Sequence, residues 1–272
     1  MNHFPRRHIS HLLSGLLLAG ATLGLSAVAH ADQLDTITAA KTIRIAIDPG
    51  VPPYSMKDDK LNLTGSDVET ARLLAKDWGL KLEIVPTTGA NRIPFLETDK
   101  ADIVISTLSI TPERAKVIDF SVPYAGIGVV LAAPKSMDIK SAADLAGKKV
   151  VATRGTTNDQ EITKLLPKDA NIVRYDDDAT SITAIVSNQA DIFATAPELL
   201  KVINEKNPAK HMEVKFTIKV NMLAIGMRKG EPRLKAKIDE WVRANLKNGQ
   251  LNAIYKKFHG VDLPEDVTKN GA

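Results

Sequence analysis

The fold of this chain is decided by one stretch, residues 102–114, which reads Asp-Ile-Val-Ile-Ser-Thr-Leu-Ser-Ile-Thr-Pro-Glu-Arg. Its apolar start, residues 102–105, predicts a short buried strand. Thr111, Pro112 and Glu113 then follow in the order of an N-cap, a first helical residue and a first-turn acid, so a helix is expected to begin there. A strand that leads directly into a helix is typical of α/β folds.

The turn between this strand and this helix carries the groups of an anion site. Thr107 and Ser109 supply hydroxyls, the helix start supplies N–H groups, and Arg114 supplies a guanidinium. Ligand crevices of open α/β sheets lie at the carboxyl ends of strands, where these groups converge. A carboxylate fits such a site. The spacing also suits a surface arginine after an ordinary strand–helix turn, and the stretch alone does not separate the two interpretations.

The first 31 residues have the pattern of a secretory signal peptide. Arg6 and Arg7 precede an apolar segment, residues 12–25, and Ala29-His30-Ala31 has the small-x-small form of a cleavage site. The paired arginines are also compatible with twin-arginine export, and the apolar segment is short for a membrane span. Cleavage after Ala31 leaves 241 of 272 residues, and the absence of cysteine excludes a lipid anchor at the cleavage site. We expect a periplasmic protein that is not embedded in a membrane.

Composition removes several other classes of function. The signal peptide holds two of the 36 basic residues and no acid, so the mature chain has 34 basic against 32 acidic residues. These charges are scattered and lack interleaved aromatics, which argues against nucleic-acid binding. Four of the six histidines precede residue 32, and only His211 and His259 remain. With no cysteine, a histidine–cysteine metal site or a histidine-based triad has too few residues, so we expect no metal, no cofactor and no catalytic residue.

Two parts of the chain repeat one plan. Residues 101–107 and 190–196 both follow a predicted helix, begin with Ala-Asp-Ile and end in small or hydroxyl residues. Each has an upstream partner strand that runs into a turn, residues 43–47 in one case and 149–153 in the other. Two copies of a β-α-β plan predict two similar α/β lobes, although short strands can also resemble one another by chance.

Further local patterns give more expectations. Residues 66–69, Ser-Asp-Val-Glu, have the form of a capping box with Ser66 as the N-cap. Residues 213–220 and 222–227 each predict a strand. A helix from Glu231 carries an apolar stripe that is expected to be core. The residues after Gly260 are polar and are expected to form a frayed tail.

Six motifs, taken in order, resemble family 3 solute-binding proteins, which are bacterial periplasmic receptors for amino acids and related small polar acids that serve ABC importers. The resemblance covers essentially the whole mature chain. The motifs are Ile43-Arg44-Ile45 with Asp48, residues 106–114, Phe120-Ser121-Val122-Pro123-Tyr124, Asp144-Leu145-Ala146-Gly147-Lys148, Arg154-Gly155-Thr156-Thr157, and Gly249 followed by Ile254-Tyr255-Lys256-Lys257-Phe258.

The resemblance implies an α/β protein of the two-lobed type II class, in which each lobe is a mainly parallel sheet flanked by helices and the ligand cleft lies between the lobes. Gly126 and Gly128 are a candidate hinge where the chain crosses. The implied partners are a small carboxylate ligand and an inner-membrane ABC permease with its ATPase; the receptor is expected to be a monomer and not an enzyme. The expected parts are a signal peptide at 1–31, a first lobe at 33–125 plus 222–262, a second lobe at 126–221 and a C-terminal tail at 263–272.

Family members also imply roles for particular residues. Arg114 would clamp the ligand's α-carboxylate with help from the Ser109 hydroxyl. Thr157 would cap the same carboxylate from the other lobe, and its place at a helix start suits an anion. The full set of expected ligand-binding residues is Arg114, Ser109, Thr107, Thr157, Asn158, Arg92, Asp48, Tyr54 and Ala196.

Two positions depart from the family pattern. Ala196 stands where relatives have an aspartate that takes the ligand's α-ammonium, and a buried ammonium needs an acceptor. Either the ligand has no α-amine, or another acid such as Glu198 or Asp159 reaches it. Val51 stands where many relatives stack an aromatic ring on the ligand, and Tyr54 is expected to compensate in part.

The remaining cues concern the class of ligand. Residues 91–94, Asn-Arg-Ile-Pro, resemble the segment of receptors for acidic amino acids in which the arginine meets a side-chain carboxylate, although Arg92 could also brace a helix start. Together with Arg114 and the missing acid, this predicts an anionic ligand, either an acidic amino acid bound in an unusual way or an amine-free dicarboxylate or related organic acid. Cyclohexadienyl dehydratases share the fold, and Glu198 would be the general acid of such an enzyme. They retain the aspartate that Ala196 replaces, which disfavours that alternative.

Overall fold

The computed structural model describes residues 32–271, and the expected signal peptide, residues 1–31, lies outside the described residues. The strands are β1 (Thr42–Ile47), β2 (Met56–Lys57), β3 (Leu63–Thr64), β4 (Lys81–Pro86), β5 (Ile103–Val104), β6 (Ile118–Pro134), β7 (Lys149–Thr153), β8 (Asn171–Tyr175), β9 (Ile192–Thr195) and β10 (Met212–Arg228). The helices are α1 (Gln33–Ala40), α2 (Ser66–Asp77), α3 (Arg92–Glu97), α4 (Thr157–Leu165), α5 (Asp178–Val186), α6 (Leu199–Lys206), α7 (Pro232–Lys247), α8 (Gln250–His259) and α9 (Glu265–Gly271), with 3₁₀ turns η1 (Arg114–Lys116), η2 (Ala142–Leu145) and η3 (Pro208–Lys210).

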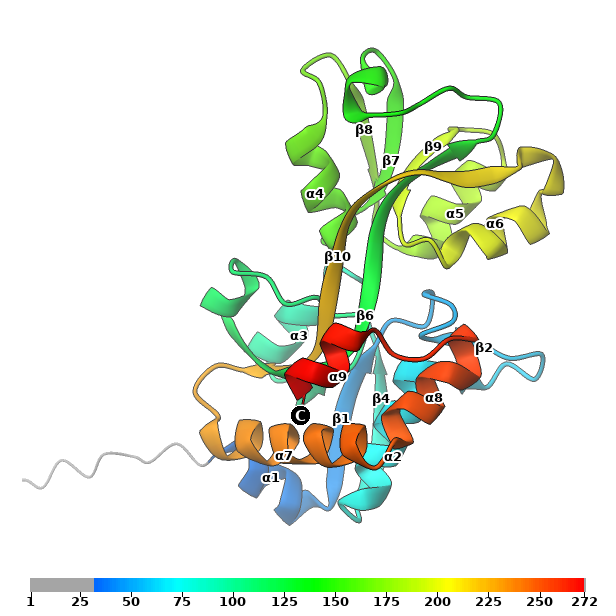
Figure 1. The fold of residues 1–272 in the computed structure, drawn as a ribbon. Helices are drawn as coiled ribbons and strands as arrows, with labels where there is room; N and C mark the ends of the chain where they lie inside the picture. Colours follow the sequence, from blue (N-terminus) through cyan, green and yellow to red (C-terminus); the bar gives the residue numbers. More distant parts are fainter. Residues whose placement is uncertain (1–31, 272) are drawn as a thin grey trace, which may run out of the picture. The chain divides into compact units, whose positions relative to one another are not determined.

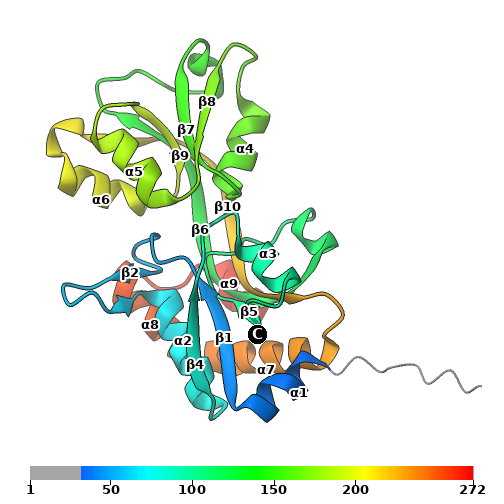
Figure 2. The same ribbon diagram turned by 180° about the vertical axis from the view of Figure 1, so that it is seen from behind.

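Eight strands form one sheet in the order β4-β1-β5-β10-β6-β9-β7-β8. The strands β4, β1 and β5 are parallel, and so are β9, β7 and β8. The long strands β6 and β10 are antiparallel to each other and run from one parallel group to the other (Figures 1 and 2). We call the group built on β1, β4 and β5 the first lobe and the group built on β7, β8 and β9 the second lobe. The two-lobed α/β fold predicted from the sequence is thereby confirmed.

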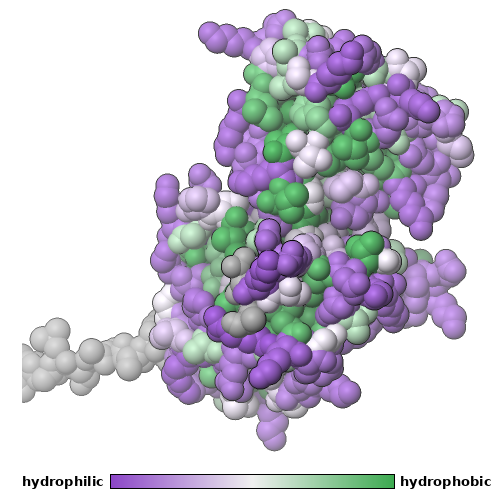
Figure 3. All heavy atoms as spheres, viewed as in Figure 1, coloured by the Kyte–Doolittle hydropathy of each residue, from purple (hydrophilic) through white to green (hydrophobic). Residues whose placement is uncertain are grey.

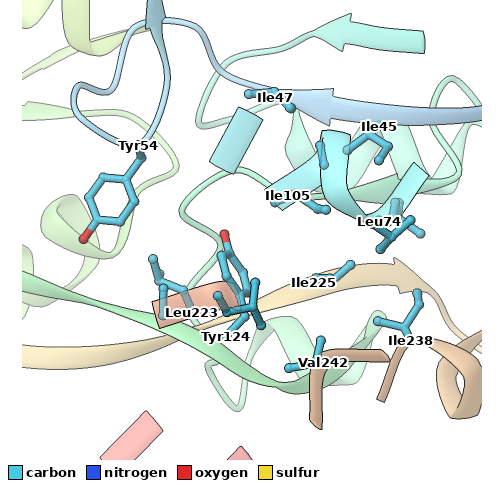
Figure 4. Packing of buried hydrophobic residues seen from close by; sticks show 14 of the residues in the cluster. Ile45, Ile47, Tyr54, Leu74, Ile105, Tyr124, Leu223, Ile225, Ile238 and Val242 are labelled. Atoms are coloured by element: carbon cyan, nitrogen blue, oxygen red, sulfur yellow. The ribbon is translucent and has the colours of Figure 1, made fainter. Parts of the chain in front are cut away.

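Each lobe has its own hydrophobic core on both faces of its sheet. In β1, Ile45 and Ile47 belong to one buried cluster and Ala46 between them belongs to another, because successive strand residues point to opposite faces. In β7, Val151 and its neighbour Val150 likewise belong to two different buried clusters. Figure 4 shows Ile45 and Ile47 within the largest cluster. On the face seen in Figure 3, hydrophilic residues cover most of the outline of both lobes, and hydrophobic residues gather towards the middle.

The apolar stripe of α7 is core, as its spacing predicts. Leu234, Ile238 and Val242 are fully buried in the first lobe's main cluster. Burying an aliphatic side chain of this size contributes about 1.5–3 kcal/mol. Trp241 lies on the same face and donates from its Nε1 to Asp77 Oδ2 at 2.8 Å, which ties α7 to α2.

The crossing between the lobes differs from expectation. The two strands predicted at 213–228 are one continuous strand, β10, and Gly126 and Gly128 lie inside the equally continuous β6. A Cβ at Gly126 would lie 3.2 Å from Pro264 Cγ, and one at Gly128 would lie 3.1 Å from Pro197 Cδ. These glycines therefore make room for two prolines packed against the strand and do not interrupt it.

Two predicted helix starts also need correction. The helix expected from Thr111 is only the 3₁₀ turn η1, because β6 begins shortly afterwards, although the Thr111 hydroxyl still accepts from the backbone N–H of Arg114 at 3.2 Å. The capping box is wrong, because α2 begins at Ser66 itself and Gly65 is the N-cap. Gly65 has φ +122°, and a Cβ there would lie 2.3 Å from the carbonyl oxygen of Tyr54, so only glycine fits.

The expected frayed tail is instead ordered into α9. Leu263 and Val267 are buried in the first lobe's main cluster, and Val267 has no exposed surface. Leu263 lies just before α9 and Val267 lies within it, so two apolar contacts hold a short and otherwise polar segment against the core. Polar composition alone was a poor guide to order here.

Candidate functional site

A small cavity lies between the two lobes and is lined by residues of both. Its free space is about 20 Å³, which is room for about one water molecule. A solute the size of an amino acid therefore enters only when the lobes stand further apart. The lining residues are Val51, Arg92, Thr107, Ser109, Ile127, Thr156, Thr157, Asn158, Asp178, Ala196 and Leu199. Six of the nine predicted ligand residues lie on this wall, and Arg114, Asp48 and Tyr54 do not.

Arg114 lies behind the wall and bridges the lobes. Its side chain is 5% exposed. Its Nη1 donates to the carbonyl oxygen of Ser109 in the first lobe at 2.9 Å, and its Nη2 donates to the carbonyl oxygen of Gly155 in the second lobe at 3.0 Å. Burial, followed by repulsion from Arg92, lowers the pKa of Arg114 to about 9. The guanidinium therefore remains charged at neutral pH.

Two hydroxyls meet beside this guanidinium, one from each lobe. The Oγ of Ser109 and the Oγ1 of Thr157 are 3.3 Å apart. Thr157 is the first residue of α4, and the N-cap before it is Thr156, whose hydroxyl accepts from Asp159 N at 3.2 Å. Hydroxyl donors, a guanidinium and a helix start together favour an anion at this point. Asn158, the next residue of α4, extends the wall.

Arg92 is buried in the first lobe, and most of its N–H groups donate hydrogen bonds to backbone carbonyl oxygens. Its Nε donates to Gly89 O at 3.0 Å, and its Nη1 donates to Ser106 O at 2.8 Å and to Thr107 O at 3.0 Å. Its Nη2 makes a longer contact with Gly155 O, 3.5 Å. Burial lowers the pKa of Arg92, and nearby carboxylates oppose that shift. The contacts to backbone carbonyls fit an arginine that braces the start of α3. Only Nη2, whose contact is long, could serve in ligand binding.

Asp48 and Tyr54 do not line the cavity. The Asp48 carboxylate accepts from Gly50 N at 3.0 Å, and burial raises its pKa. Tyr54 is fully buried in the first lobe's main cluster, and its hydroxyl donates to Gly126 O at 2.7 Å (Figure 4). In this arrangement the Tyr54 ring does not stand in for the aromatic that Val51 replaces.

Neither acid suggested as a substitute at Ala196 reaches the cavity. Glu198 lines a separate pocket, and its Oε1 lies 3.5 Å from the Tyr54 hydroxyl. Asp159 is paired with Arg174 Nε at 2.8 Å and 3.0 Å. Ala196 itself lies on the cavity wall, 2% exposed.

Sequence reasoning missed Asp178, which is a carboxylate on the cavity wall. It is 6% exposed and begins α5, just beyond β8. The signal was present, because β8 ends at Tyr175, which pairs in parallel register with Thr153 at the end of β7. Acids that follow β8 therefore reach the same sheet edge as the loop after β7.

Within the described part of the chain, no cluster of three or more histidines, cysteines and acids could hold a metal ion. Among the helices of residues 32–271, none combines the length and the apolar character needed to cross a bilayer.

Comparison with known proteins identifies the class. Residues 43–261 match the model of bacterial extracellular solute-binding proteins, family 3. The chain belongs to this family.

Individual relatives span nearly the whole chain. The L-cystine-binding protein of Escherichia coli K12 is 28% identical over 256 residues, which cover 92% of this chain and 96% of that protein. The cyclohexadienyl dehydratase of Pseudomonas aeruginosa is 27% identical over 253 residues, which cover 90% and 91%. The solved structure of an ancestral amino acid-binding protein, a precursor of cyclohexadienyl dehydratase, is 35% identical with a TM-score of 0.74 and covers 84% of this chain and 99% of that one.

Proposed function

We propose that this protein is a periplasmic receptor that binds a small carboxylate-bearing solute between its lobes and delivers it to an ABC permease. The observation that carries the proposal is the Arg114 guanidinium, which donates across the cleft to Gly155 O at 3.0 Å. Family membership supports the same function.

The contacts of Arg114 suggest how a ligand is held. When the lobes part, the second-lobe carbonyl of Gly155 leaves the guanidinium, and Nη2 becomes free to donate. A carboxylate can then accept from the guanidinium and from the hydroxyls of Ser109 and Thr157. Charge-assisted hydrogen bonds of this kind are about twice as strong as neutral ones. Because the two hydroxyls belong to different lobes, a bound carboxylate favours closure.

We propose boundaries for the two lobes that agree with the pairing of the two long strands. We place the first lobe at 33–125 plus 222–262 and the second at 126–221, so that both crossings fall inside β6 and β10, where Gly126 pairs with Met222. The segment after residue 262 joins the first lobe, because Val267 lies in that lobe's core.

We infer that the solute is an amino acid. This agrees with relatives whose names state L-cystine or amino-acid binding. An acidic amino acid would bring a second carboxylate to Arg92 Nη2, whose present contact is long. An amine-free dicarboxylate has no ammonium and would need no anionic partner at Ala196. Both remain alternatives that a ligand panel separates.

The partner is expected to be an inner-membrane ABC permease with its ATPase. The receptor would act in the periplasm as a monomer after removal of residues 1–31. Transport assays that require the permease, compared with and without the receptor, test this part of the proposal.

A dehydratase is the second candidate, because the Pseudomonas enzyme covers 90% of this chain. Such an enzyme needs a general acid in the cleft. Glu198 was the candidate, yet it lines the separate pocket and not the cavity of Arg92, Ser109 and Thr157. We therefore propose that the protein is not an enzyme. Incubation with prephenate or arogenate, followed by absorbance, would contradict this if product appeared.

The binding function is tested with a panel of amino acids and dicarboxylates in thermal-shift and calorimetric assays. A ligand at 100 times its dissociation constant should stabilise the protein by about 2.7 kcal/mol. Arg114→Lys, which cannot hold a carboxylate bidentately, should weaken the best ligand by about 10- to 100-fold. Arg154→Lys, which changes an exposed arginine of the same cleft loop as Gly155, should leave binding within about twofold. No binding across the panel, or equal effects of both variants, would refute the proposal.

A further inference from the structure

The question left by Ala196 is which group, if any, accepts a ligand amine. Asp178 is the single carboxylate on the cavity wall among residues 32–271. Its Oδ1 accepts from Thr153 Oγ1 at 2.6 Å, and within the described residues no hydrogen bond reaches its Oδ2. Asp178 is only 6% exposed, so few water molecules compete with a ligand for its Oδ2. Oδ2 keeps accessible surface, and because Asp178 lines the cavity, a donor group of a ligand there can reach it.

Asp178 is not needed to hold its own helix. The N-cap of α5 is the preceding residue, Asp177, whose carboxylate accepts from Thr180 N at 2.6 Å. Thr153 likewise has a second partner in Ser181, at 2.8 Å. A purely structural role for the charge of Asp178 therefore has little support.

The charges around Arg92 leave a surplus of negative charge near Asp178. Three buried aspartates, Asp48, Asp67 and Asp178, attract this one guanidinium. Asp67 has two donors of its own, the Tyr124 hydroxyl at 2.7 Å and Thr107 N at 2.8 Å. Burial raises the pKa of Asp178 to about 6, Asp48 and Asp177 add to that rise, and Arg92 opposes it. At pH 7 the carboxylate is therefore mainly ionised and lacks a full counter-charge.

We propose that Asp178 takes the α-ammonium of the ligand in place of the acid that Ala196 lacks, so the ligand is an amino acid and not an amine-free acid. Ala196 lies on the same cavity wall, and its small side chain leaves room for the ammonium to reach the start of α5. The inference rests on the proposed function, because Arg114 must hold the carboxylate end. The two charged ends of the ligand would then contact different lobes, the carboxylate at Arg114 and the ammonium at Asp178.

The first test uses the wild-type protein and matched pairs of probes. The pairs are L-glutamate and glutarate, L-arginine and 5-guanidinopentanoate, L-histidine and 3-(imidazol-4-yl)propionate, and L-cystine and 3,3′-dithiodipropionate. In whichever pair binds, calorimetry should show that the amino acid binds at least about 10-fold more tightly than its deaminated analogue. Equal binding within a pair would overturn the inference and leave the carboxylate receptor intact. If no member of any pair binds, the proposed function fails and this inference falls with it.

The second test uses variants. Asp178→Asn keeps the acceptor for Thr153 and removes the charge. It should weaken the affinity for the amino acid by about 10- to 100-fold and leave the affinity for the deaminated analogue within about twofold of wild type. Asp176→Asn is the matched control, because it removes an 82%-exposed carboxylate two residues away. Adding Ala196→Asp to Asp178→Asn should restore at least about half of the lost affinity on a logarithmic scale. An Asp178→Asn variant that binds the amino acid as tightly as wild type would overturn the inference.

Discussion

The contact between Gly155 and Ala90 offers a way to test lobe closure with one methyl group. Gly155 follows β7 in the second lobe, and a Cβ there would lie 2.7 Å from Ala90 Cα in the first lobe. Ordinary contact begins at 3.4 Å, so Gly155→Ala requires the lobes to move apart locally by about 0.7 Å, the difference between these distances. The same movement would lengthen the 3.0 Å bond from Arg114 Nη2 to Gly155 O to roughly 3.7 Å, beyond hydrogen-bond range.

Two costs must be separated in that variant. Gly155 has φ +76°, so alanine carries a backbone cost of about 1 kcal/mol wherever the lobes stand. Gly147→Ala is the matched control, because Gly147 has φ +67° in the same lobe and a Cβ there would have nothing within 4 Å. Both variants should lose similar stability. Only Gly155→Ala should also disfavour closure, by roughly 1–3 kcal/mol, because its methyl group meets Ala90 in the closed form.

The assays are small-angle scattering of the free protein and calorimetry with the panel member that binds wild type. Gly155→Ala should show a larger radius of gyration than Gly147→Ala and about 10-fold weaker binding. If the two variants bind equally and scatter identically, the loop of Gly155 does not control closure, and the argument from its contact with Ala90 is wrong.

Three further predictions concern stability. Burial raises the pKa of Asp178 to about 6 in the folded protein, so its ionised form costs stability above that pH. Asp178→Asn should therefore be more stable than wild type at pH 7 in urea unfolding. The difference should change little between pH 7 and pH 6 and then shrink between pH 6 and pH 4, by at most about 1.4 kcal/mol per pH unit; a constant difference across that range would contradict this. Gly65→Ala should lose roughly 3 kcal/mol or more in thermal or urea unfolding, against about 1 kcal/mol for Gly79→Ala, whose Cβ would meet nothing within 4 Å; similar losses would show that the chain near α2 relaxes. Val267→Ala should cost roughly 2 kcal/mol in the same assay, against less than about 0.5 kcal/mol for Val261→Ala at a 59%-exposed position; equal effects would mean that α9 does not pack in solution.

Local patterns predicted the strands well where apolar runs ended in turns. Residues 42–47 and 149–153 are short apolar runs bounded by turn residues, a pattern that predicts strands. Both are strands in the structure. The same rule failed along β6 and β10. Their interiors contain glycines and polar residues at the crossing, which look like strand ends in a sequence but are accommodated by pairing with each other over 17 residues each.

The candidate site was predictable in part for a related reason. Ser109, Thr157 and Arg114 follow strand ends, so their convergence could be expected from the topology of parallel sheets. Asp178 could not be predicted in the same way, because nothing local in the sequence separates a helix-capping Asp177 from a cavity-lining Asp178. Which of two adjacent aspartates points into a cavity depends on tertiary packing, and it is visible only once α5 is placed against β7.

The position of β10 has a consequence for how the chain is made. β10 lies between β5 and β6 in the sheet, although more than a hundred residues separate it from β5. On a chain that emerges amino end first, β5 has no neighbour on that side until residue 228 is available, whereas β7, β8 and β9 are complete earlier. We expect the second lobe to fold first and the first lobe to remain unfinished until late, because its central pairing has the longest loop to close.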